Sequence, residues 1–179
     1  MISDTKVVAI GGGTGLSTML KGLKLHTHNI TAVVTVADDG GSSGILRSDL
    51  GMLAPGDVRN CVSALAEVDP VMGELLNFRF KDGSLKGHSL GNLFLAALNE
   101  TSSSFDEAVK KFSHLTGVVG TVYPVTNESV TLSALLEDGR LIEGESHIGV
   151  HHDGPKNGIV KLMVNPEKPK AVDGDIKAL

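Results

Sequence analysis

A cluster of glycines that follows an apolar segment is the first feature of this sequence that could do chemistry. Residues 7–10 are all apolar, and the next five residues are Gly11, Gly12, Gly13, Thr14 and Gly15. Glycine allows a backbone to approach a ligand closely, and the free N–H groups at the start of a helix attract anions. Because a helical pattern of leucines follows, the segment predicts a loop that binds a nucleotide or another phosphorylated ligand.

The spacing of these glycines differs from that of both common nucleotide-binding loops. The fingerprint G-x-G-x-x-G, counted from Gly11, requires a glycine where this chain has Leu16. The Walker A loop requires a Gly-Lys pair, and no lysine follows Gly15. A tight turn that binds nothing would also use glycine. Four glycines in five residues exceed what such a turn needs, so we expect a ligand.

Two carboxylates open a second polar cluster, which runs from Asp38 and Asp39 to Gly44. It follows the apolar run 30–37, which predicts a strand buried in a parallel sheet. Ligands bind beyond the carboxyl ends of such strands, and carboxylates beside a phosphate commonly hold Mg²⁺. A solvated turn is the alternative, because Asp-Gly favours turns. We expect Asp38 and Asp39 to lie at the ligand site.

Two further clusters lie where helices are expected to begin. Asp57 is a good N-cap residue, and on a helix it shares a face with Asn60. A purely structural role is an equal alternative for this pair. His88 and Asn92 are i, i+4 neighbours if their helix starts early enough. Gly91 between them costs about 1 kcal/mol relative to Ala, which close approach of a ligand or another backbone would explain.

Composition excludes several classes of protein. The 179 residues suit one domain, and a net charge of −5 with 3% aromatic residues argues against a nucleic-acid surface. Cys61 is the only cysteine, which excludes an internal disulfide and fits a reducing cytoplasm. The sequence shows neither a membrane span nor a signal peptide. We interpret residues 151–153, His-His-Asp, as surface residues rather than metal ligands.

The elements that must position these residues follow an α/β pattern. Strand 6–10, helix 15–23 and strand 30–37 form a βαβ unit, followed by an irregular stretch at 38–56. One helix is expected to begin at residue 57, a second to span 89–99, and a third to run from the capping box at 104–107 to residue 117. Strands are expected at 121–125 and 159–164. A hairpin at about 130–145 turns at Asp138-Gly139.

These elements predict a single doubly wound α/β domain over residues 1–179. Its sheet is mostly parallel, in a Rossmann-like three-layer arrangement with an antiparallel hairpin insertion. Residues 171–179 begin a helical pattern that soon stops, so we expect that the chain is cut at its C-terminus.

Four motifs, at residues 11–17, 36–44, 54–60 and 87–92, together resemble the YvcK-like gluconeogenesis factor family. That family belongs to the CofD-like superfamily, whose founding enzyme is a 2-phospho-L-lactate transferase. The resemblance covers nearly the whole chain. It implies a cytoplasmic bacterial protein, needed for cell shape and wall synthesis on gluconeogenic carbon, that binds a UDP-sugar such as UDP-N-acetylglucosamine. Family members are longer than this chain, and in the transferase branch aspartates that match Asp39 and Asp57 hold a divalent metal.

We therefore expect a nucleotide-sugar-binding regulator, with Mg²⁺ at Asp39 and Asp57 and no assigned catalytic residue. The expected ligand contacts are Gly11, Gly12, Gly13, Thr14, Gly15, Ser17, Asp38, Asp39, Asn60, His88 and Asn92. The alternative is a Mg²⁺-dependent transferase that moves a phospholactyl or phosphoryl-type group from a nucleotide diphosphate carrier. Leu16 disfavours a dehydrogenase that uses NAD. The sequence leaves two kinds of partner open: a cell-wall regulatory protein, and further copies of this chain in a homo-oligomer.

Overall fold

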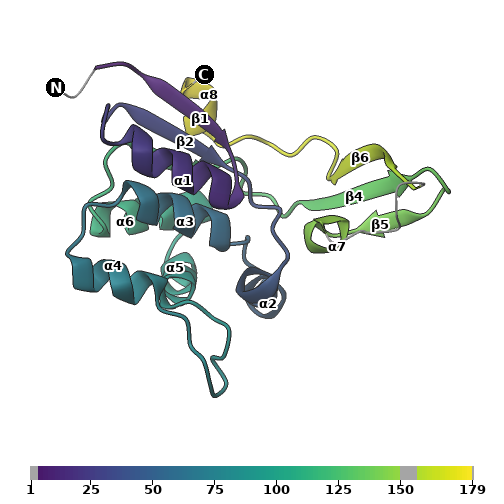
Figure 1. Cartoon of the computed structure of the whole chain (residues 1–179), viewed down its shortest axis with the longest axis horizontal. Helices are drawn as coiled ribbons and strands as arrows, with labels where there is room; N and C mark the ends of the chain where they lie inside the picture. The colour runs from purple at the N-terminus through teal and green to yellow at the C-terminus, as the bar shows by residue number, and fades with distance from the viewer. Residues whose placement is uncertain (1–3, 150–156, 179) are drawn as a thin grey trace.

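The protein has an α/β body from which an antiparallel sheet projects as an arm (Figure 1). The computed structural model describes residues 4–149 and 157–178, apart from the side chain of Asp175. Within these residues no helix is both long and apolar enough to cross a membrane.

A three-stranded parallel sheet forms the centre of the body. Strand β1 (Val7–Gly11) is followed by helix α1 (Gly13–Leu23) and strand β2 (Ile30–Val34). Strand β2 pairs in parallel with β1 on one side and with β3 (Thr121–Pro124) on the other. The predicted βαβ unit and the predicted strand at 121–125 are therefore confirmed.

Helices cover one face of this sheet. Helix α3 (Gly56–Leu65) packs against α1 and lies over β2 and β3, while α5 (Leu90–Glu100) and α6 (Phe105–Leu115) complete the layer. The predicted stripe of Val58, Val62 and Leu65 on α3 is fully buried in the core. On the opposite face, Gly174 of α8 (Asp173–Ala178) lies against the ring of Tyr123. The architecture is thus layered α/β, as predicted.

The arm contains the predicted hairpin and the strand predicted at 159–164. Strand β4 (Thr131–Leu136) pairs with β5 (Leu141–Glu143) on one side and with β6 (Ile159–Asn165) on the other, and both pairings are antiparallel. Gly139 alone takes a positive φ in the turn, and Leu136 N–H donates to Arg140 O. The turn is therefore a three-residue loop with a left-handed glycine rather than the type I′ turn that Asp-Gly favours.

Among the described residues, three helices were not predicted from the sequence. Helix α2 (Gly41–Leu50) replaces most of the irregular stretch expected at 38–56, α4 (Pro70–Asn77) follows α3, and α7 (Glu145–Gly149) follows β5. Helix α2 is rich in glycine and serine, which disfavour helices. Tertiary packing compensates, because Ser42, Ser43 and Leu46 are buried.

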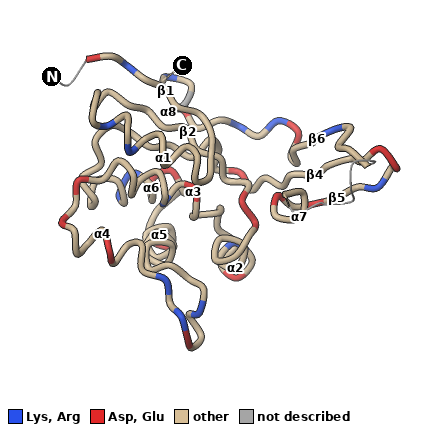
Figure 2. Tube along the Cα trace, in the orientation of Figure 1, with Lys and Arg blue, Asp and Glu red and all other residues tan. Residues whose placement is uncertain are grey.

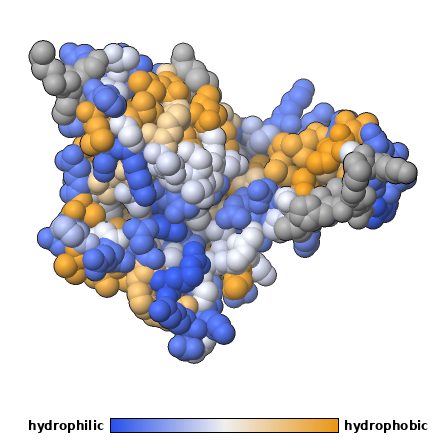
Figure 3. All heavy atoms as spheres, in the orientation of Figure 1, coloured by the Kyte–Doolittle hydropathy of each residue, from blue (hydrophilic) through white to orange (hydrophobic). Residues whose placement is uncertain are grey.

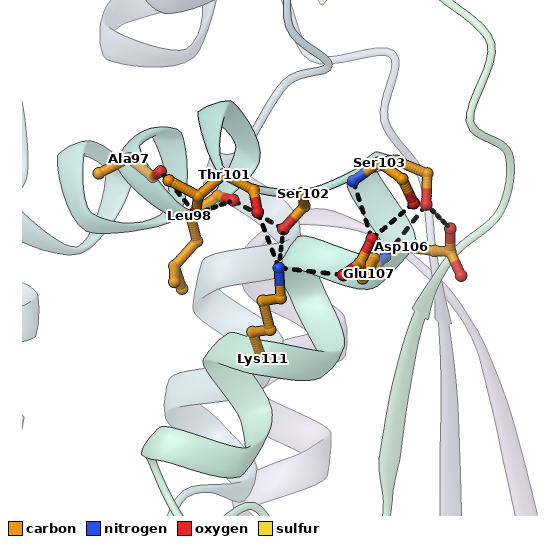
Figure 4. A network of polar contacts seen from close by, with 9 residues as sticks. Ala97, Leu98, Thr101, Ser102, Ser103, Asp106, Glu107 and Lys111 are labelled. Atoms are coloured by element: carbon orange, nitrogen blue, oxygen red, sulfur yellow. Dashed lines mark hydrogen bonds and ion pairs between the residues drawn. The ribbon is translucent and has the colours of Figure 1, made fainter.

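The predicted N-cap at Ser104 of α6 is confirmed, although Glu107 bonds to Ser103 rather than back to the N–H of Ser104, and a polar network surrounds the cap (Figure 4). Ser104 Oγ accepts the N–H of Glu107, and the Glu107 carboxylate accepts the N–H of Ser103. Lys111 pairs with Glu107 and also donates to the carbonyl oxygen of Thr101. These contacts fix the corner between α5 and α6.

Gly91 is required by close packing of two helices. A Cβ atom at this position would lie 2.6 Å from the carbonyl oxygen of Leu76 and 2.9 Å from Cδ of Arg59. The approach of another backbone, one of the two explanations offered for Gly91, is therefore what the structure contains.

We predict that Gly91→Ala lowers the free energy of unfolding by about 1–3 kcal/mol, because the new methyl group overpacks the contact between α4 and α5. Gly22→Ala in α1 is the matched control, since a Cβ there meets nothing within 4 Å. It should raise stability by up to about 1 kcal/mol through helix propensity alone. Urea denaturation measures both variants, and equal effects of the two substitutions would contradict the packing explanation.

Candidate functional site

A cleft of ≈ 480 Å³ opens where the carboxyl ends of β1 and β2 meet the arm. The body contributes its loops and the start of α3, and the arm contributes β4 and α7. The lining residues are Gly12, Gly13, Thr35, Ala37, Asp38, Asp57, Leu132 and Glu145. This is the edge at which parallel sheets bind ligands.

The glycine loop forms one wall of the cleft. Gly13 has a φ of +66°, a left-handed conformation that favours glycine. A Cβ atom on Gly12 would lie 2.1 Å from Cγ2 of Thr35 and 2.7 Å from Oδ2 of Asp57. Gly15 has open space where a side chain would be. Packing therefore explains Gly12 and backbone conformation explains Gly13, whereas neither explains Gly15.

The other predicted residues of this loop do not line the cleft. Gly11 is the last residue of β1, and its carbonyl oxygen accepts the N–H of Thr35. Thr14 is exposed, and Ser17 is buried with its Oγ donating to the carbonyl oxygen of Thr14 at 3.1 Å. Ser17 thus closes the first turn of α1.

Three carboxylates line the cleft: Asp57, which contacts the glycine loop directly, and Asp38 and Glu145. Burial raises the pKa of Asp57 and nearby Asp38 adds to this effect, although the N–H of Gly13 bonds to Asp57 and opposes it. Burial and the charges of Asp38, Asp39 and Asp57 raise the pKa of Glu145. The cleft therefore concentrates negative charge, which a bound cation would offset.

Asp39 points into a neighbouring cleft of ≈ 370 Å³, which it lines together with Gly44 and Arg47. Its Oδ1 accepts the N–H of Ser146 at 2.8 Å. Burial raises its pKa, but hydrogen bonds from Ser146 outweigh that effect and the net pKa is lowered. The predicted metal pair of Asp39 and Asp57 is therefore divided between two adjacent clefts, while Asp38 and Asp57 share one.

The residues present could hold a magnesium ion only together with a ligand. Among the described residues, no group of three or more His, Cys, Asp and Glu side chains is arranged to bind a metal. Mg²⁺ is commonly held by one or two carboxylates, substrate phosphates and water rather than by a cage of protein ligands. Asp38 and Asp57 beside the glycine loop fit that pattern.

His88 and Asn92 come together in a buried network beneath α2. Asn92 Nδ2 donates to Ser42 Oγ at 3.1 Å, and Ser42 Oγ lies 3.0 Å from His88 Nδ1. Arg59 Nε donates to Asn92 Oδ1 at 3.3 Å, and Arg59 Nη1 donates to Asn77 Oδ1 at 2.9 Å. The network joins α2, α3, α4 and α5 behind the cleft.

Some predicted residues lie apart from the cleft, and the sequence prediction missed others. Asn60 is half-buried in α3, and neither it nor His88 and Asn92 lines the cleft. Residues 151–153 lie outside the described residues. The sequence prediction missed Thr35, which forms part of no distinctive motif. Arg59 does lie in the motif at 54–60, but the partner expected for it is a phosphate or an acid, whereas its side chain donates to Asn92 and Asn77. Ser42 lies in the polar cluster at 38–44, which the sequence analysis did identify as part of the candidate site.

Comparison with known proteins identifies the family of this chain. The model of the 2-phospho-L-lactate transferase CofD family matches residues 7–179. A putative gluconeogenesis factor of Clostridium acetobutylicum is 53% identical over 179 residues, which are 100% of this chain and 40% of that protein. The gluconeogenesis factor of Bacillus subtilis is 46% identical over 175 residues, 94% of this chain and 53% of that protein.

A solved structure extends the similarity to three dimensions. The crystal structure of a Bacillus halodurans protein superposes with a TM-score of 0.89 at 42% identity, covering 97% of this chain and 55% of that one. The chain therefore spans about half the length of the relatives it matches. It belongs to the 2-phospho-L-lactate transferase CofD family, among the proteins named gluconeogenesis factors.

Proposed function

We propose that this chain forms the phosphate-binding part of a nucleotide-sugar-binding gluconeogenesis factor. The observation that carries the proposal is the glycine loop, which lies at the carboxyl end of a parallel sheet and lines one cleft together with the carboxylates of Asp38 and Asp57. A diphosphate would accept hydrogen bonds from N–H groups at the start of α1 other than that of Gly13, which already bonds to Asp57. The open space at Gly15 would let a ligand lie against the helix.

Asp38 and Asp57 are the residues that would hold Mg²⁺ in this proposal. When bound, the cation would neutralise the phosphate oxygens, which these carboxylates would otherwise repel. Asp38 Oδ1 accepts the N–H of Gly40 at 2.9 Å, which orients the carboxylate. The buried network of Ser42, His88, Asn92 and Arg59 would hold α2 and α3 in place around the site.

The proposed ligand is a UDP-sugar of the UDP-N-acetylglucosamine type, and the proposed role is cytoplasmic control of carbon allocation to the cell envelope. A regulatory protein of cell-wall synthesis would respond to the bound state. These finer features come from the resemblance to gluconeogenesis factors. The family match also supports a second candidate, a Mg²⁺-dependent transferase that uses a nucleotide diphosphate carrier.

Calorimetry with UDP-N-acetylglucosamine, GDP and NAD, each with and without Mg²⁺, tests the proposal. We expect saturable binding of the UDP-sugar that strengthens with Mg²⁺, and no binding of NAD. Release of a nucleotide from the carrier during incubation would favour the transferase. Failure of all three ligands to bind would contradict both candidates.

We predict that Asp57→Asn weakens Mg²⁺-dependent binding at least tenfold, or about 1.4 kcal/mol, without lowering stability at neutral pH. The reason is that the raised pKa of Asp57 makes its ionised form unfavourable in the folded protein at pH values above that pKa. Calorimetry and thermal unfolding measure the two effects. A loss of stability equal to that of a core substitution would indicate a structural aspartate instead.

Binding should also depend on pH in a defined direction. Mg²⁺ binds the ionised carboxylate, and the pKa of Asp57 is raised above its ordinary value, so affinity should increase with pH across the range in which Asp57 ionises. Titrations of the wild type and Asp57→Asn over this range provide the measurement. The variant should show a flatter profile, and identical profiles would contradict the assignment of Asp57.

The same binding and unfolding measurements distinguish the role of Asp38 from that of Asp39. Because Asp38 shares the cleft with Asp57, Asp38→Asn should remove most of the Mg²⁺ dependence. Asp39→Asn should instead lower stability, since the folded state favours the ionised form of Asp39 through its bonds to Ser146. The reverse pattern would assign the cation to Asp39, as the sequence analysis expects, and would contradict the assignment to Asp38.

A further inference from the structure

The arm is held to the body at its base and again at α7. At the base, Nη2 of Arg47 in α2 donates to Ser129 Oγ at 3.1 Å and to the carbonyl oxygen of Val130, just before β4. The chain enters and leaves the arm there, and a β-bridge between Thr126 and Ala171 joins the two connecting segments. In the view of Figure 3, the arm projects from the body beyond this base. The contact at α7 therefore influences how the rest of the arm lies.

The contact at α7 is made by Asp39 of the body. Asp39 Oδ1 accepts the N–H of Ser146 at 2.8 Å, although the two residues are 107 positions apart. Oδ2 lies against Gly144, where a Cβ atom would be 2.4 Å from it. The backbone of Asp39 is packed on α2, because its carbonyl oxygen would lie 2.1 Å from a Cβ on Gly44. Asp39 is thus fixed on the body and turns both carboxylate oxygens towards the arm.

The bond from Ser146 to Asp39 is the bond that a helix N-cap makes. The carbonyl oxygen of Gly144 accepts the N–H of Ile148, so Gly144 is the N-cap residue of α7 and Ser146 is the second residue of the helix. An N-cap side chain normally accepts the N–H of the second or third helical residue. Gly144 has no side chain, and its φ of +97° disfavours one. The Asp39 carboxylate therefore supplies the cap that α7 lacks in its own sequence.

Helix α7 has little else to stabilise it. It contains five residues, none of which is buried. Isolated helices shorter than about 12–15 residues are marginal in water, and a missing cap leaves N–H groups unpaired at the start of a helix. The folding of α7 therefore depends strongly on its bond to the body.

Charge opposes this position of α7. Its first residue, Glu145, lines the cleft together with Asp38 and Asp57 of the body. The negative charges of Asp38, Asp39 and Asp57 act on Glu145, and like charges repel one another. Figure 2 shows the acidic segment after β2 beside the acidic start of α7. The hydrogen bond to Asp39 is thus what offsets the repulsion between the arm and the body.

We propose that Asp39 is a positioning residue that closes the arm over the cleft by capping α7. Closure of the arm and folding of α7 are then one event. When the bond to Ser146 opens, α7 unfolds, Glu145 leaves the cleft, and the arm pivots about its base at Arg47. Asp39 acts through α7 rather than on a ligand, so the proposal does not depend on the ligand proposed above.

Amide hydrogen exchange of the 179-residue chain, measured by NMR without ligand, tests the proposal. The N–H of Ile148 bonds within α7, that of Leu136 bonds within the arm sheet, and that of Val119 bonds within the body. In Asp39→Ala, exchange at Ile148 should accelerate at least tenfold more than exchange at the other two. Equal acceleration at all three amides would indicate a general loss of stability, and unchanged exchange at Ile148 would show that α7 folds without its cap. Either result would overturn the proposal.

Two further variants test the cap from both sides. Asp39→Asn keeps an oxygen that can accept the Ser146 N–H but loses the charge, so exchange at Ile148 should lie between that of the wild type and that of Asp39→Ala. Gly144→Ala should accelerate it as well, because the new Cβ collides with Asp39. An Asp39→Asn variant that exchanges as fast as Asp39→Ala would contradict the capping role.

Gly139→Ala is the matched control for Gly144→Ala. Gly139 also lies in the arm with a positive φ, +85°, but a Cβ there meets nothing within 4 Å. It carries the same kind of backbone strain without the collision, so exchange at Ile148 should stay at the wild-type rate. Equal effects of the two alanine substitutions would contradict the contact between Gly144 and Asp39 as the cause.

The position of the arm is measured by the distance between spin labels on Leu25→Cys in the body and Leu141→Cys in the arm. Both positions are exposed, at 71% and 61%. Cys61 is buried and its pKa is raised to about 12, so it should not take up the label. We expect one narrow distance distribution for the wild type and a broad one after Asp39→Ala. Equally narrow distributions would overturn the proposal that Asp39 holds the arm closed.

Discussion

The contact between Gly12 and Asp57 is the constraint on which the rest of the candidate site depends. No side chain fits at position 12, because its Cβ would overlap Thr35 and the Asp57 carboxylate. The loop after β1 can therefore lie directly on the start of α3, and the N–H of Gly13 bonds to Asp57. This close approach of the backbone at Gly12 to the Asp57 carboxylate thus brings the start of α1 and the carboxylates of the cleft together.

Two carboxylates of the cleft, Asp57 and Glu145, lower the stability of the folded chain, and this supports a functional role for them. Burial and neighbouring negative charge raise the pKa of Asp57 and Glu145, so their ionised forms are unfavourable in the folded chain at neutral pH. Asp39 differs, because the N–H of Ser146 stabilises its charge. Carboxylates that destabilise a fold and line its cleft are typical of sites that bind a cation or ligand.

Much of the fold follows from sequence periodicity, whereas the supporting contacts do not. We could predict the strands β1, β2 and β3 and the apolar stripe of α3, because burial of one face of an element places its apolar residues at a regular spacing in the sequence. The βαβ rule also placed Asp38 near the glycine loop. Helix α2 could not be predicted, because its glycines and serines form a helix only through the burial of Ser42, Ser43 and Leu46. The bonds from Arg59 to Asn92 and from Asn92 to Ser42 depend on that packing.

The most direct test of the account is an NMR titration of the ¹⁵N-labelled chain with UDP-N-acetylglucosamine and Mg²⁺. The central claim is that the N–H groups at the start of α1 bind a diphosphate. The account predicts large shifts of the amide signals of Gly12, Gly13 and Gly15, with little change in α4. Saturable binding that leaves these three amides unchanged would contradict it.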